Sequence, residues 1–388
     1  MTEKTKKILI VTGIYPPSIG GPASYSRFLA EKLSKDFSVK LITYSSVWSF
    51  PDDKIMPFKV VRVWKKVPKG LRHWNFFMKA FFSAGKSDVV FALNAVSAGV
   101  PALMAAKIRN KKFFVKIVGD YAWETAINKK KTNLLLNDFQ KSKKVGFVGL
   151  LHNLQTWVCK NADGVIVPSE YLAELVRGWG VSGDKIKVIY NGVDFKPADI
   201  TKEEAKRHIG VFGNIVLSAG RLVPWKGFRM LIKIMPQLAE VSQLFRLVIV
   251  GDGPDMANLK MMVRNMGLER KVFLVGRKSQ EELAIYMAAA DMFVLNTGYE
   301  GFSHQILEVM TAGVPVITTA VGGNKEIIRQ GENGFMVKYQ DEFNLTEAIK
   351  SLWQNPELRE EFKKEGKKTA EQFSSEKMFQ ETIKALTN

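Results

Sequence analysis

Short apolar runs recur along the chain, and they constrain its fold more than any other feature of the sequence. A short apolar run bounded by polar residues is typical of a strand buried on both faces of a parallel sheet. In the first half, such runs lie at residues 8–12, 39–43, 89–92, 113–118, 165–167 and 186–189. Helical patterns lie between several of them, so the first half is predicted to be an α/β domain with a parallel sheet.

The second half repeats this scheme, with runs at residues 215–218, 247–250, 272–275, 292–295, 316–318 and 335–337. A turn-forming sequence around Asn191-Gly192 and a polar stretch precede it, and we place the linker there. A chain of 388 residues suits two domains. We therefore expect a doubly wound, Rossmann-like domain over residues 1–193 and another over residues 194–373, with helices after Pro356 and Ser375 closing the chain. Such sheets bind ligands beyond the carboxyl ends of their strands, so the crevice between the domains is the expected active site.

Cysteine content and hydropathy exclude several classes of protein. The single cysteine, Cys159, excludes an intrachain disulfide and suits a reducing compartment. No apolar run reaches the ~20 residues of a membrane-spanning helix. The N-terminal lysines lead directly into the first strand, which is not the pattern of a secretory signal. We expect a cytoplasmic protein.

Positive charge is concentrated in the first half of the chain. Of the net charge of +19, residues 1–193 carry +18 and residues 194–388 carry +1. A basic half predicts an extended anionic partner, either a membrane surface or nucleic acid. Aromatic residues and cations interleave in residues 64–82, and lysines cluster in residues 129–144. The first segment suits a helix whose rings lie among lipid headgroups, although a helix buried in the domain would carry the same phenylalanines. We favour a membrane surface.

The segment from Tyr299 to Glu308 carries the strongest functional signal. Glu300 follows the strand at 292–295 and therefore lies at its carboxyl end, while Gly301 allows a ligand to approach the backbone. A helix predicted to begin near Ser303 directs its free N–H groups at an anion such as a diphosphate. Glu308 shares a helix face with Gln305 and offers a carboxylate to hydroxyl groups. The segment indicates a sugar-nucleotide site, the alternative being an ordinary capped helix with a solvated glutamate.

Two cations follow the strand at 215–218. Arg221 and Lys226 lie between Gly220 and Gly227, and glycines mark places where a backbone turns tightly or admits a ligand. Transfer of a sugar from a nucleoside diphosphate builds negative charge on the departing diphosphate. An arginine fork and a lysine point charge suit those oxygens, although surface cations would look the same in isolation.

These segments together resemble the glycosyltransferase family 4, whose members are retaining enzymes. The resemblance rests on Glu300 and Glu308 followed by Gly313-Val314-Pro315-Val316-Ile317, on residues 218–227 with Gly251-Asp252-Gly253-Pro254, and on the opening strand with the glycines after Pro16-Pro17. It covers nearly the whole chain. It implies the GT-B fold, two Rossmann-like domains that face each other across a cleft. The last helix, about residues 374–388, would then return to the N-terminal, acceptor-side domain.

The resemblance also implies roles for individual residues. Glu300 would contact the donor sugar, and Glu308 the ribose hydroxyls, while Arg277 would border the base. The expected catalytic residues are Glu300, Arg221, Lys226 and Asp120. The expected donor-binding residues are Gly20, Gly21, Gly301, Phe302, Ser303, Leu307, Glu308 and Arg277.

One position departs from the family pattern. Near the end of the strand at 113–118 many relatives carry a histidine that approaches the donor sugar, whereas this chain reads Val118-Gly119-Asp120-Tyr121. Asp120 is then the expected polar group, and it either orients a hydroxyl group or caps the next helix. Trp123 either stacks on a sugar or belongs to the core.

The sequence thus predicts a retaining, hexosyltransferase-type enzyme at the inner face of the membrane. It would move a sugar from a UDP- or GDP-sugar to a glycan or lipid-linked acceptor in envelope polysaccharide or glycolipid synthesis. Front-face attack, in which the leaving phosphate takes the acceptor's proton, requires no protein nucleophile. The chain has no Asp-x-Asp triplet and four scattered histidines, so no metal or other cofactor is expected. The alternatives are a sugar-nucleotide epimerase of the same fold and, in a different class, a nucleic-acid-binding protein that uses the basic half.

Overall fold

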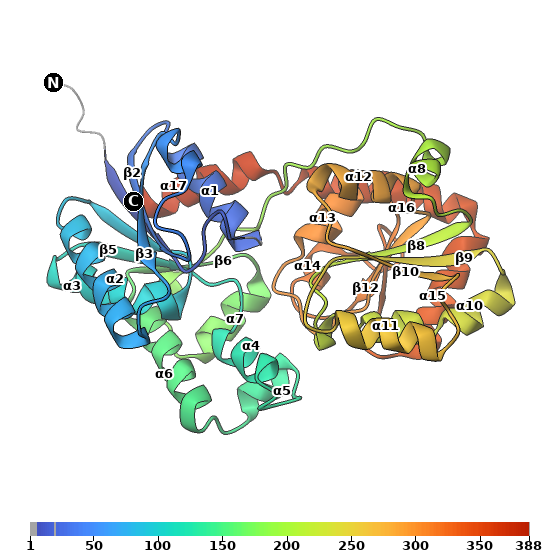
Figure 1. Cartoon of the computed structure of the whole chain (residues 1–388), viewed down its shortest axis with the longest axis horizontal. Coiled ribbons are helices and arrows are strands. Elements are labelled where there is room, and N and C mark those ends of the chain that lie inside the picture. The colour runs from blue at the N-terminus through green and yellow to red at the C-terminus, as the bar shows by residue number, and fades with distance from the viewer. Residues whose placement is uncertain (1–5, 19–20, 388) are drawn as a thin grey trace. The chain divides into compact units, whose positions relative to one another are not determined.

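The computed structural model describes residues 6–18 and 21–387, and the chain forms two compact units (Figure 1). Unit 1 comprises Met1–Tyr190 and Glu376–Asn388, and unit 2 comprises Asn191–Ser375. Within the described residues, no helix is both long enough and apolar enough to cross a bilayer.

Unit 1 is built on a parallel sheet with the strand order β3-β2-β1-β4-β5-β6-β7 in the described part of the chain. Its strands are β1 (Lys7–Thr12), β2 (Ser38–Ser45), β3 (Lys59–Trp64), β4 (Val89–Ala92), β5 (Lys112–Lys116), β6 (Gly164–Val167) and β7 (Ile186–Val188). Its helices are α1 (Gly21–Leu33), α2 (Lys69–Ala84), α3 (Val100–Ile108), α4 (Tyr121–Asn128), α5 (Leu136–Lys141), α6 (Gly146–Asn161), α7 (Glu170–Gly178) and α17 (Ser375–Thr387).

Both faces of this sheet are buried. Along β1, Leu9 and Val11 pack in one core cluster, together with residues of α2, α3 and α7, while Ile8 and Ile10 pack in another. The second cluster includes residues of α1 and of the C-terminal helix α17. Alternate side chains of a strand point to opposite faces, so helices on both faces explain why the strands read as continuous apolar runs.

Strand β3 does not appear among the strands predicted from the sequence, because charged residues interrupt its apolar pattern. Among the described residues it is the edge strand of the sheet, and it pairs with β2. Its Arg62 is buried and forms an ion pair with Asp53, with 2.7 Å between Nε and Oδ2. A charged side chain can be buried in a strand when an ion pair neutralises it. Such a strand is not detected by a search for apolar runs.

Unit 2 contains a second parallel sheet, with the order β10-β9-β8-β11-β12-β13 in the described residues. Its strands are β8 (Asn214–Ala219), β9 (Phe245–Val250), β10 (Val272–Gly276), β11 (Met292–Leu295), β12 (Val316–Thr319) and β13 (Phe335–Val337). Its helices are α8 (Lys202–Ile209), α9 (Phe228–Lys233), α10 (Met235–Val241), α11 (Met256–Asn265), α12 (Gln280–Ala289), α13 (His304–Thr311), α14 (Asn324–Ile327), α15 (Glu342–Gln354) and α16 (Pro356–Glu371).

The boundaries between the units follow Tyr190 and Ser375, whereas the sequence placed them after Val193 and before residue 374. Local packing explains the difference. The Val193 N–H donates to the carbonyl of Phe373 at 3.0 Å, and a Cβ atom at Gly192 would overlap the Ser374 carbonyl oxygen. The first residues of unit 2 are therefore bound to its last ones. The stretch predicted as a linker also contains α8, which begins with a capping box at Thr201.

Candidate active site

The strand order of unit 2 reverses between β8 and β11. These neighbouring strands are paired, yet the chain leaves β8 toward β9 and leaves β11 toward β12 on the other side. Loops that diverge in this way open a crevice at the carboxyl edge of a parallel sheet, where ligands of α/β proteins bind. The loop after β8, residues 220–227, and the loop after β11, residues 296–303, contain six of the twelve predicted site residues.

These two loops are held against each other. The Trp225 carbonyl accepts hydrogen bonds from the Gly298 N–H, at 2.6 Å, and from the Thr297 hydroxyl, at 3.2 Å. Gly227 has a φ of 67°, and a Cβ atom there would overlap the Asn296 carbonyl oxygen. Glycine is therefore required at this position both for its left-handed backbone and for the close approach of the second loop.

Lys226 and Glu300 meet across this contact. The lysine Nζ lies 2.5 Å from the glutamate Oε2, and the two side chains are only 15% and 17% exposed. The main-chain carbonyl of Glu300 also accepts from the Gly323 N–H at 3.1 Å. An ion pair this far removed from water is strongly oriented, so it fixes an ammonium group and a carboxylate at the point where the strand order reverses.

Helix α13 begins as the sequence predicted. Ser303 is its N-cap, and its hydroxyl accepts from the Ile306 N–H at 3.3 Å. The side chains of Phe302 and Leu307 are buried, and the Phe302 ring packs 5.3 Å from that of Phe373. Both side chains therefore belong to the core, and the part of these two residues in donor binding stays a prediction. Gly301 is buried as well, and a Cβ atom at Gly323 would overlap its carbonyl oxygen.

Glu308 lies on α13, partly buried. Burial raises the pKa of its carboxyl to about 7, because a charge in this position is poorly hydrated. Its Oε1 accepts from the side-chain amide of Gln280 at 3.3 Å. The neighbouring Gln305 side chain packs against Gly220, which connects this helix with the loop after β8.

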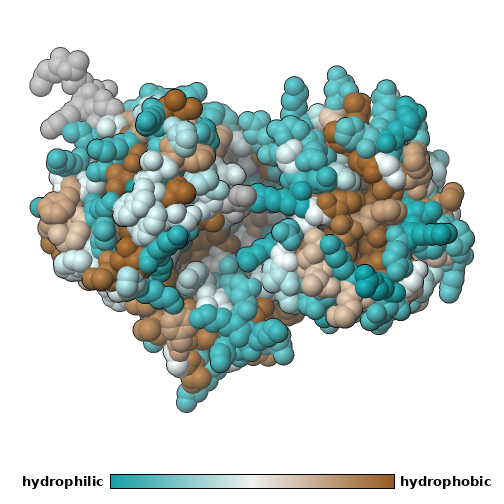
Figure 2. All heavy atoms as spheres, in the orientation of Figure 1, coloured by the Kyte–Doolittle hydropathy of each residue, from teal (hydrophilic) through white to brown (hydrophobic). Residues whose placement is uncertain are grey.

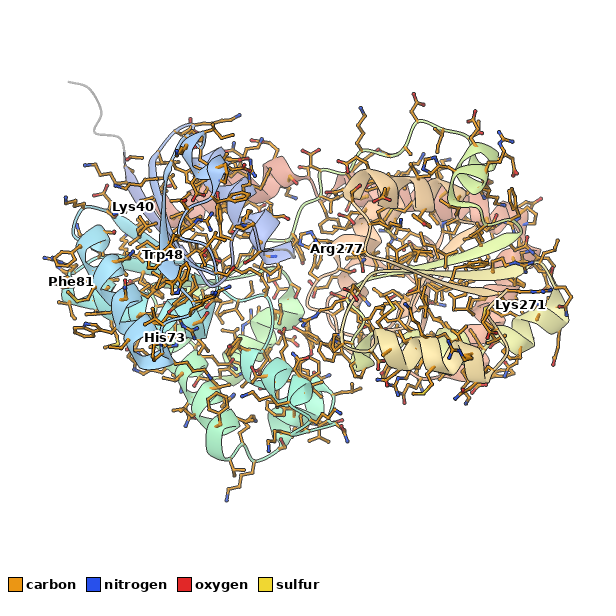
Figure 3. All side chains as sticks on the ribbon, in the orientation of Figure 1. Lys40, Trp48, His73, Phe81, Lys271 and Arg277 are labelled. Carbon is orange, nitrogen blue, oxygen red and sulfur yellow. The ribbon has the colours of Figure 1, made fainter. Side chains whose placement is uncertain are left out.

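Arg221 and Arg277 are both exposed, and neither side chain forms an ion pair or hydrogen bond with another residue in the described part of the chain. Arg221 lies in the loop that carries Lys226. Arg277 directly follows β10, and Figure 3 shows it at the opposite end of that strand from Lys271. Both guanidinium groups are thus at the carboxyl edge of the sheet and available to an anion.

Asp120, predicted as catalytic, is a helix cap. Its carboxylate is fully buried in unit 1 and accepts from the Trp123 N–H at 2.9 Å, from Gln155 Nε2 at 2.9 Å and from Gln140 Nε2 at 2.7 Å. Three donors from its own unit satisfy both oxygens, so the capping alternative explains this residue. Trp123 is completely buried and its indole N–H donates to Leu134, which assigns it to the core.

The two glycines predicted for unit 1 have different outcomes. Gly20 lies outside the described residues. Gly21 is the first residue of α1 and is exposed, with open space where a side chain would lie. Its part in donor binding stays a prediction.

Sequence reasoning missed Gln280 and Gly323, which contact Glu308 and the main chain of Glu300. The pair Gly322-Gly323 begins three residues after Thr319, the end of β12, and paired glycines in a loop after a strand are a sequence signal for a close backbone approach. Gln280 had no such signal, because an exposed glutamine in the first turn of a helix is ordinary.

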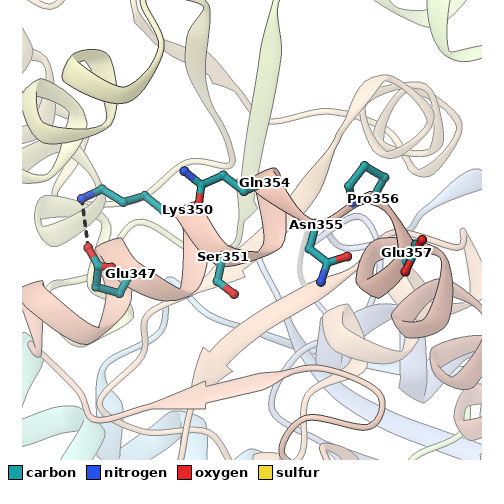
Figure 4. Close-up of a pocket in the computed structure, with 7 residues that line it drawn as sticks. All are labelled: Glu347, Lys350, Ser351, Gln354, Asn355, Pro356 and Glu357. Carbon is teal, nitrogen blue, oxygen red and sulfur yellow. Dashed lines mark hydrogen bonds and ion pairs between the residues drawn. The ribbon is translucent and has the colours of Figure 1, made fainter.

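A surface pocket also lies on α15 and the start of α16 (Figure 4). Glu347 and Lys350 form an ion pair of 2.9 Å at its side. Its lining residues include none that follow a strand directly and none predicted for the donor. The carboxyl edge of the sheet therefore remains the candidate site.

Comparisons with known proteins identify relatives of both halves of the chain. A family model described as "Glycosyl transferases group 1" matches residues 199–369, and one described as "Glycosyltransferase Family 4" matches residues 19–196. An uncharacterized glycosyltransferase of Methanocaldococcus jannaschii is 27% identical over 97% of both chains. The N-acetylgalactosamine-N,N'-diacetylbacillosaminyl-diphospho-undecaprenol 4-alpha-N-acetylgalactosaminyltransferase of Campylobacter jejuni is 26% identical over 64% of this chain and 65% of its own. The crystal structure of Anabaena HepE in complex with UDP has a TM-score of 0.79 at 20% identity, covering 98% of this chain and 99% of that one.

Both units of the chain have the parallel, doubly wound sheets of the structural neighbours, so the expected GT-B fold is confirmed. The family model identifies the class of protein, which is a glycosyltransferase. Matches over nearly all of its length identify the family as well. The chain belongs to glycosyltransferase family 4.

Proposed function

We propose that this protein transfers a sugar, with retention of anomeric configuration, from a UDP- or GDP-sugar to a glycan or lipid-linked acceptor. The observation that carries the proposal is the oriented pair of Lys226 and Glu300 at the switch point of unit 2, beside the start of α13. An ammonium group and helix N–H groups suit a departing diphosphate, and a fixed carboxylate suits the hydroxyls of a sugar.

In this proposal each group stabilises the charge that the reaction develops. Lys226 and Arg221 bind the diphosphate oxygens, and the main chain from Gly301 to Ser303 holds them at the start of α13. Glu300, oriented by Lys226, accepts hydrogen bonds from the donor sugar. The leaving phosphate takes the proton of the acceptor hydroxyl on the same face, so no protein nucleophile is required. Cations of the chain neutralise the diphosphate, and we propose that neither a metal nor another cofactor takes part.

Two comparisons support the substrate classes. The neighbour HepE is described with UDP, which favours a uridine diphosphate donor. The Campylobacter relative is named for a diphospho-undecaprenol-linked glycan, which favours a lipid-linked acceptor and hence a role in envelope glycan synthesis. Such an acceptor is reached at a membrane, and the charge of +18 in residues 1–193 suits the anionic inner face. We therefore propose a cytoplasmic protein that binds this surface peripherally.

A panel of sugar nucleotides in a thermal-shift assay tests the donor. A ligand present at 100 times its dissociation constant stabilises a fold by about 2.7 kcal/mol, so the correct base and sugar should raise the melting temperature clearly. Incubation of that donor with candidate acceptors should then yield a transferred sugar. Free epimerised sugar nucleotide without transfer would indicate the epimerase instead, and a shift with nucleic acid alone would indicate a binding protein.

Donor affinity is expected to depend on the ionisation of Glu308. If the Glu308 carboxylate accepts hydrogen bonds from ribose hydroxyls, the donor binds the ionised form of this residue. The pKa of Glu308 in the free protein is about 7, so donor binding should become tighter as pH rises through this value. Between pH 6 and pH 8 the ionised fraction changes about tenfold, and the dissociation constant should fall accordingly. Without donor, the same raised pKa lowers the free energy of unfolding as pH rises from about 4.5 to 7, because the native state retains a proton that the unfolded chain releases.

Calorimetric titrations of the parent and of Glu308→Gln across this pH range measure the effect. The variant should bind donor more weakly and show a flat profile. Glu347→Gln, which removes a carboxylate on α15, should behave like the parent. Parental affinity and parental pH dependence in Glu308→Gln would exclude the ribose assignment.

A further inference from the structure

The outer face of α2 presents a stripe of large apolar side chains to solvent. Leu71, Trp74 and Phe82 are 62%, 61% and 59% exposed. At 100° per residue they lie on one side of the helix, opposite the buried Phe76 and Ala80. A helix of a monomeric protein ordinarily exposes its polar face, so this arrangement calls for a partner.

Aromatic contacts and helix α3 extend the stripe into a continuous surface. Ring centroids are 5.4 Å apart between Trp74 and Phe77 and 5.9 Å apart between Phe77 and Phe81. From α3, which packs against α2, Met104 and Ile108 are 46% and 62% exposed. The Arg109 guanidinium lies 3.8 Å from the centre of the Phe81 ring and connects the two helices. We call this area, formed by Leu71, Trp74, Phe82, Met104 and Ile108, the α2–α3 surface.

Figure 2 shows apolar side chains among hydrophilic ones over this part of unit 1, and Figure 3 shows Phe81 at the outer edge of the unit. Residues 64–112 contain ten lysines and arginines and a single acidic residue, Asp88. In the described residues, Lys66, Lys69 and Arg72 form no ion pair, whereas lysines of unit 2 such as Lys233 and Lys363 pair with glutamates. These three cations beside the α2–α3 surface are therefore left without neutralising carboxylates in the described residues.

Neighbouring cations also disfavour one another here. Burial and the charge of Arg72 lower the pKa of Lys65, and burial together with Arg72 and Lys69 lowers the pKa of His73. An anionic partner would offset the part of these shifts that comes from the neighbouring cations. Apolar side chains that protrude between unpaired cations match the interface of an anionic bilayer, where rings and aliphatic groups enter the headgroup region and cations meet phosphates.

We propose that the α2–α3 surface binds an anionic lipid bilayer, with Leu71, Trp74 and Phe82 inserted among the lipids and Lys66 and Lys69 at the headgroups. The inference deepens the proposed function, on which it rests, since a lipid-linked acceptor lies in such a bilayer. Nucleic acid suits this surface less well, because aliphatic side chains such as Leu71, Met104 and Ile108 provide no stacking platform for bases.

Cosedimentation with vesicles tests the proposal on the full chain. Vesicles of phosphatidylcholine and phosphatidylglycerol should bind the protein, and vesicles of phosphatidylcholine alone should bind it far less. The triple variant Leu71→Gln, Trp74→Gln, Phe82→Gln should lower the partition coefficient about tenfold or more. Lys66→Glu with Lys69→Glu should lower it similarly and reduce its salt dependence.

The chain provides a matched control. Val145, Phe147 and Leu150 are 66%, 52% and 53% exposed at the start of α6, in the other basic segment. Replacing these three with glutamine removes comparable apolar area and should leave vesicle binding near the parental level. Loss of binding in this control with parental binding in the α2 variant would overturn the proposal, as would tighter binding to single-stranded RNA than to the anionic vesicles.

Trp74 provides a second readout that does not depend on how a polar variant folds. Brominated lipids should quench part of the tryptophan fluorescence of the bound protein, and Trp74→Phe should abolish that part while vesicle binding persists. Equal quenching in parent and variant would contradict insertion of this ring. The vesicle assays contain no donor, so a chain that binds vesicles through α2 but responds to no sugar nucleotide would refute the proposed function and retain this surface.

Discussion

Replacing Lys226 with methionine should lower kcat by about 100- to 1,000-fold, the range observed when one preorganised donor to a developing oxyanion is removed. The ammonium group is fixed by Glu300 at 2.5 Å, at the switch point of the sheet. A group held in this way needs no rearrangement when charge accumulates on the departing diphosphate. Steady-state kinetics with the donor found in the thermal-shift panel measures the effect.

The ion pair complicates this variant, because Lys226→Met leaves the mostly buried Glu300 without its partner. Truncating one member of such a pair often costs stability as well as activity. The double variant Lys226→Met, Glu300→Gln removes both charges, and it should recover stability without recovering turnover. Arg221→Ala is simpler, since the exposed Arg221 has no carboxylate partner among the described residues, and it should lower turnover with little change in unfolding.

Lys233 supplies the control. Its Nζ lies 2.5 Å from Glu342 in the same unit, but the lysine side chain is 56% exposed and lies on α9. Lys233→Met should leave turnover unchanged, because an exposed ion pair away from the crevice contributes little to stability and nothing to the reaction. Turnover at the parental rate in both Lys226→Met and Arg221→Ala would exclude these cations as the groups that bind the diphosphate.

The sequence could predict much of this site because its residues directly follow buried strands. Apolar runs locate the strands of a parallel sheet, and the loops after them contain Arg221, Lys226 and Glu300. Lys226 and Glu300 can pair only because β8 and β11 are neighbours in the sheet. Predicting this pair therefore requires knowledge of the strand order. No pattern within one loop contains that information.

Asp120 illustrates what remained undecidable from the sequence. A polar residue after a strand and before a helix suits both a cap and a reactive group, and local sequence does not separate the two. The structure separates the two, because the side-chain amides of Gln140 on α5 and Gln155 on α6 donate hydrogen bonds to the Asp120 carboxylate. Strand β3 was missed for a related reason, since the partner that makes Arg62 acceptable in the sheet, Asp53, lies outside the strand.

Gly227→Ala should destabilise unit 2 severely. Alanine in a left-handed conformation costs about 1–2 kcal/mol by itself. At Gly227, where φ is 67°, the new methyl group would also overlap the backbone oxygen of Asn296, which no side-chain rotation relieves. Separating the two loops would break the hydrogen bonds to the Trp225 carbonyl, so we expect a total loss of about 4 kcal/mol or more in urea unfolding.

Gly267→Ala isolates the backbone contribution. Gly267 has nearly the same φ, 65°, but nothing lies within 4 Å of a Cβ atom there. Its replacement should cost only about 1–2 kcal/mol, the conformational part alone. The difference between the two variants then measures how tightly the loop with Lys226 is held against the loop that leads to Glu300. If the two variants lose equal stability, the loops part easily, and the ion pair between them is not preorganised by this contact. The large effect expected for Lys226→Met assumes that Lys226 is preorganised. That result would therefore predict a smaller loss of turnover in Lys226→Met.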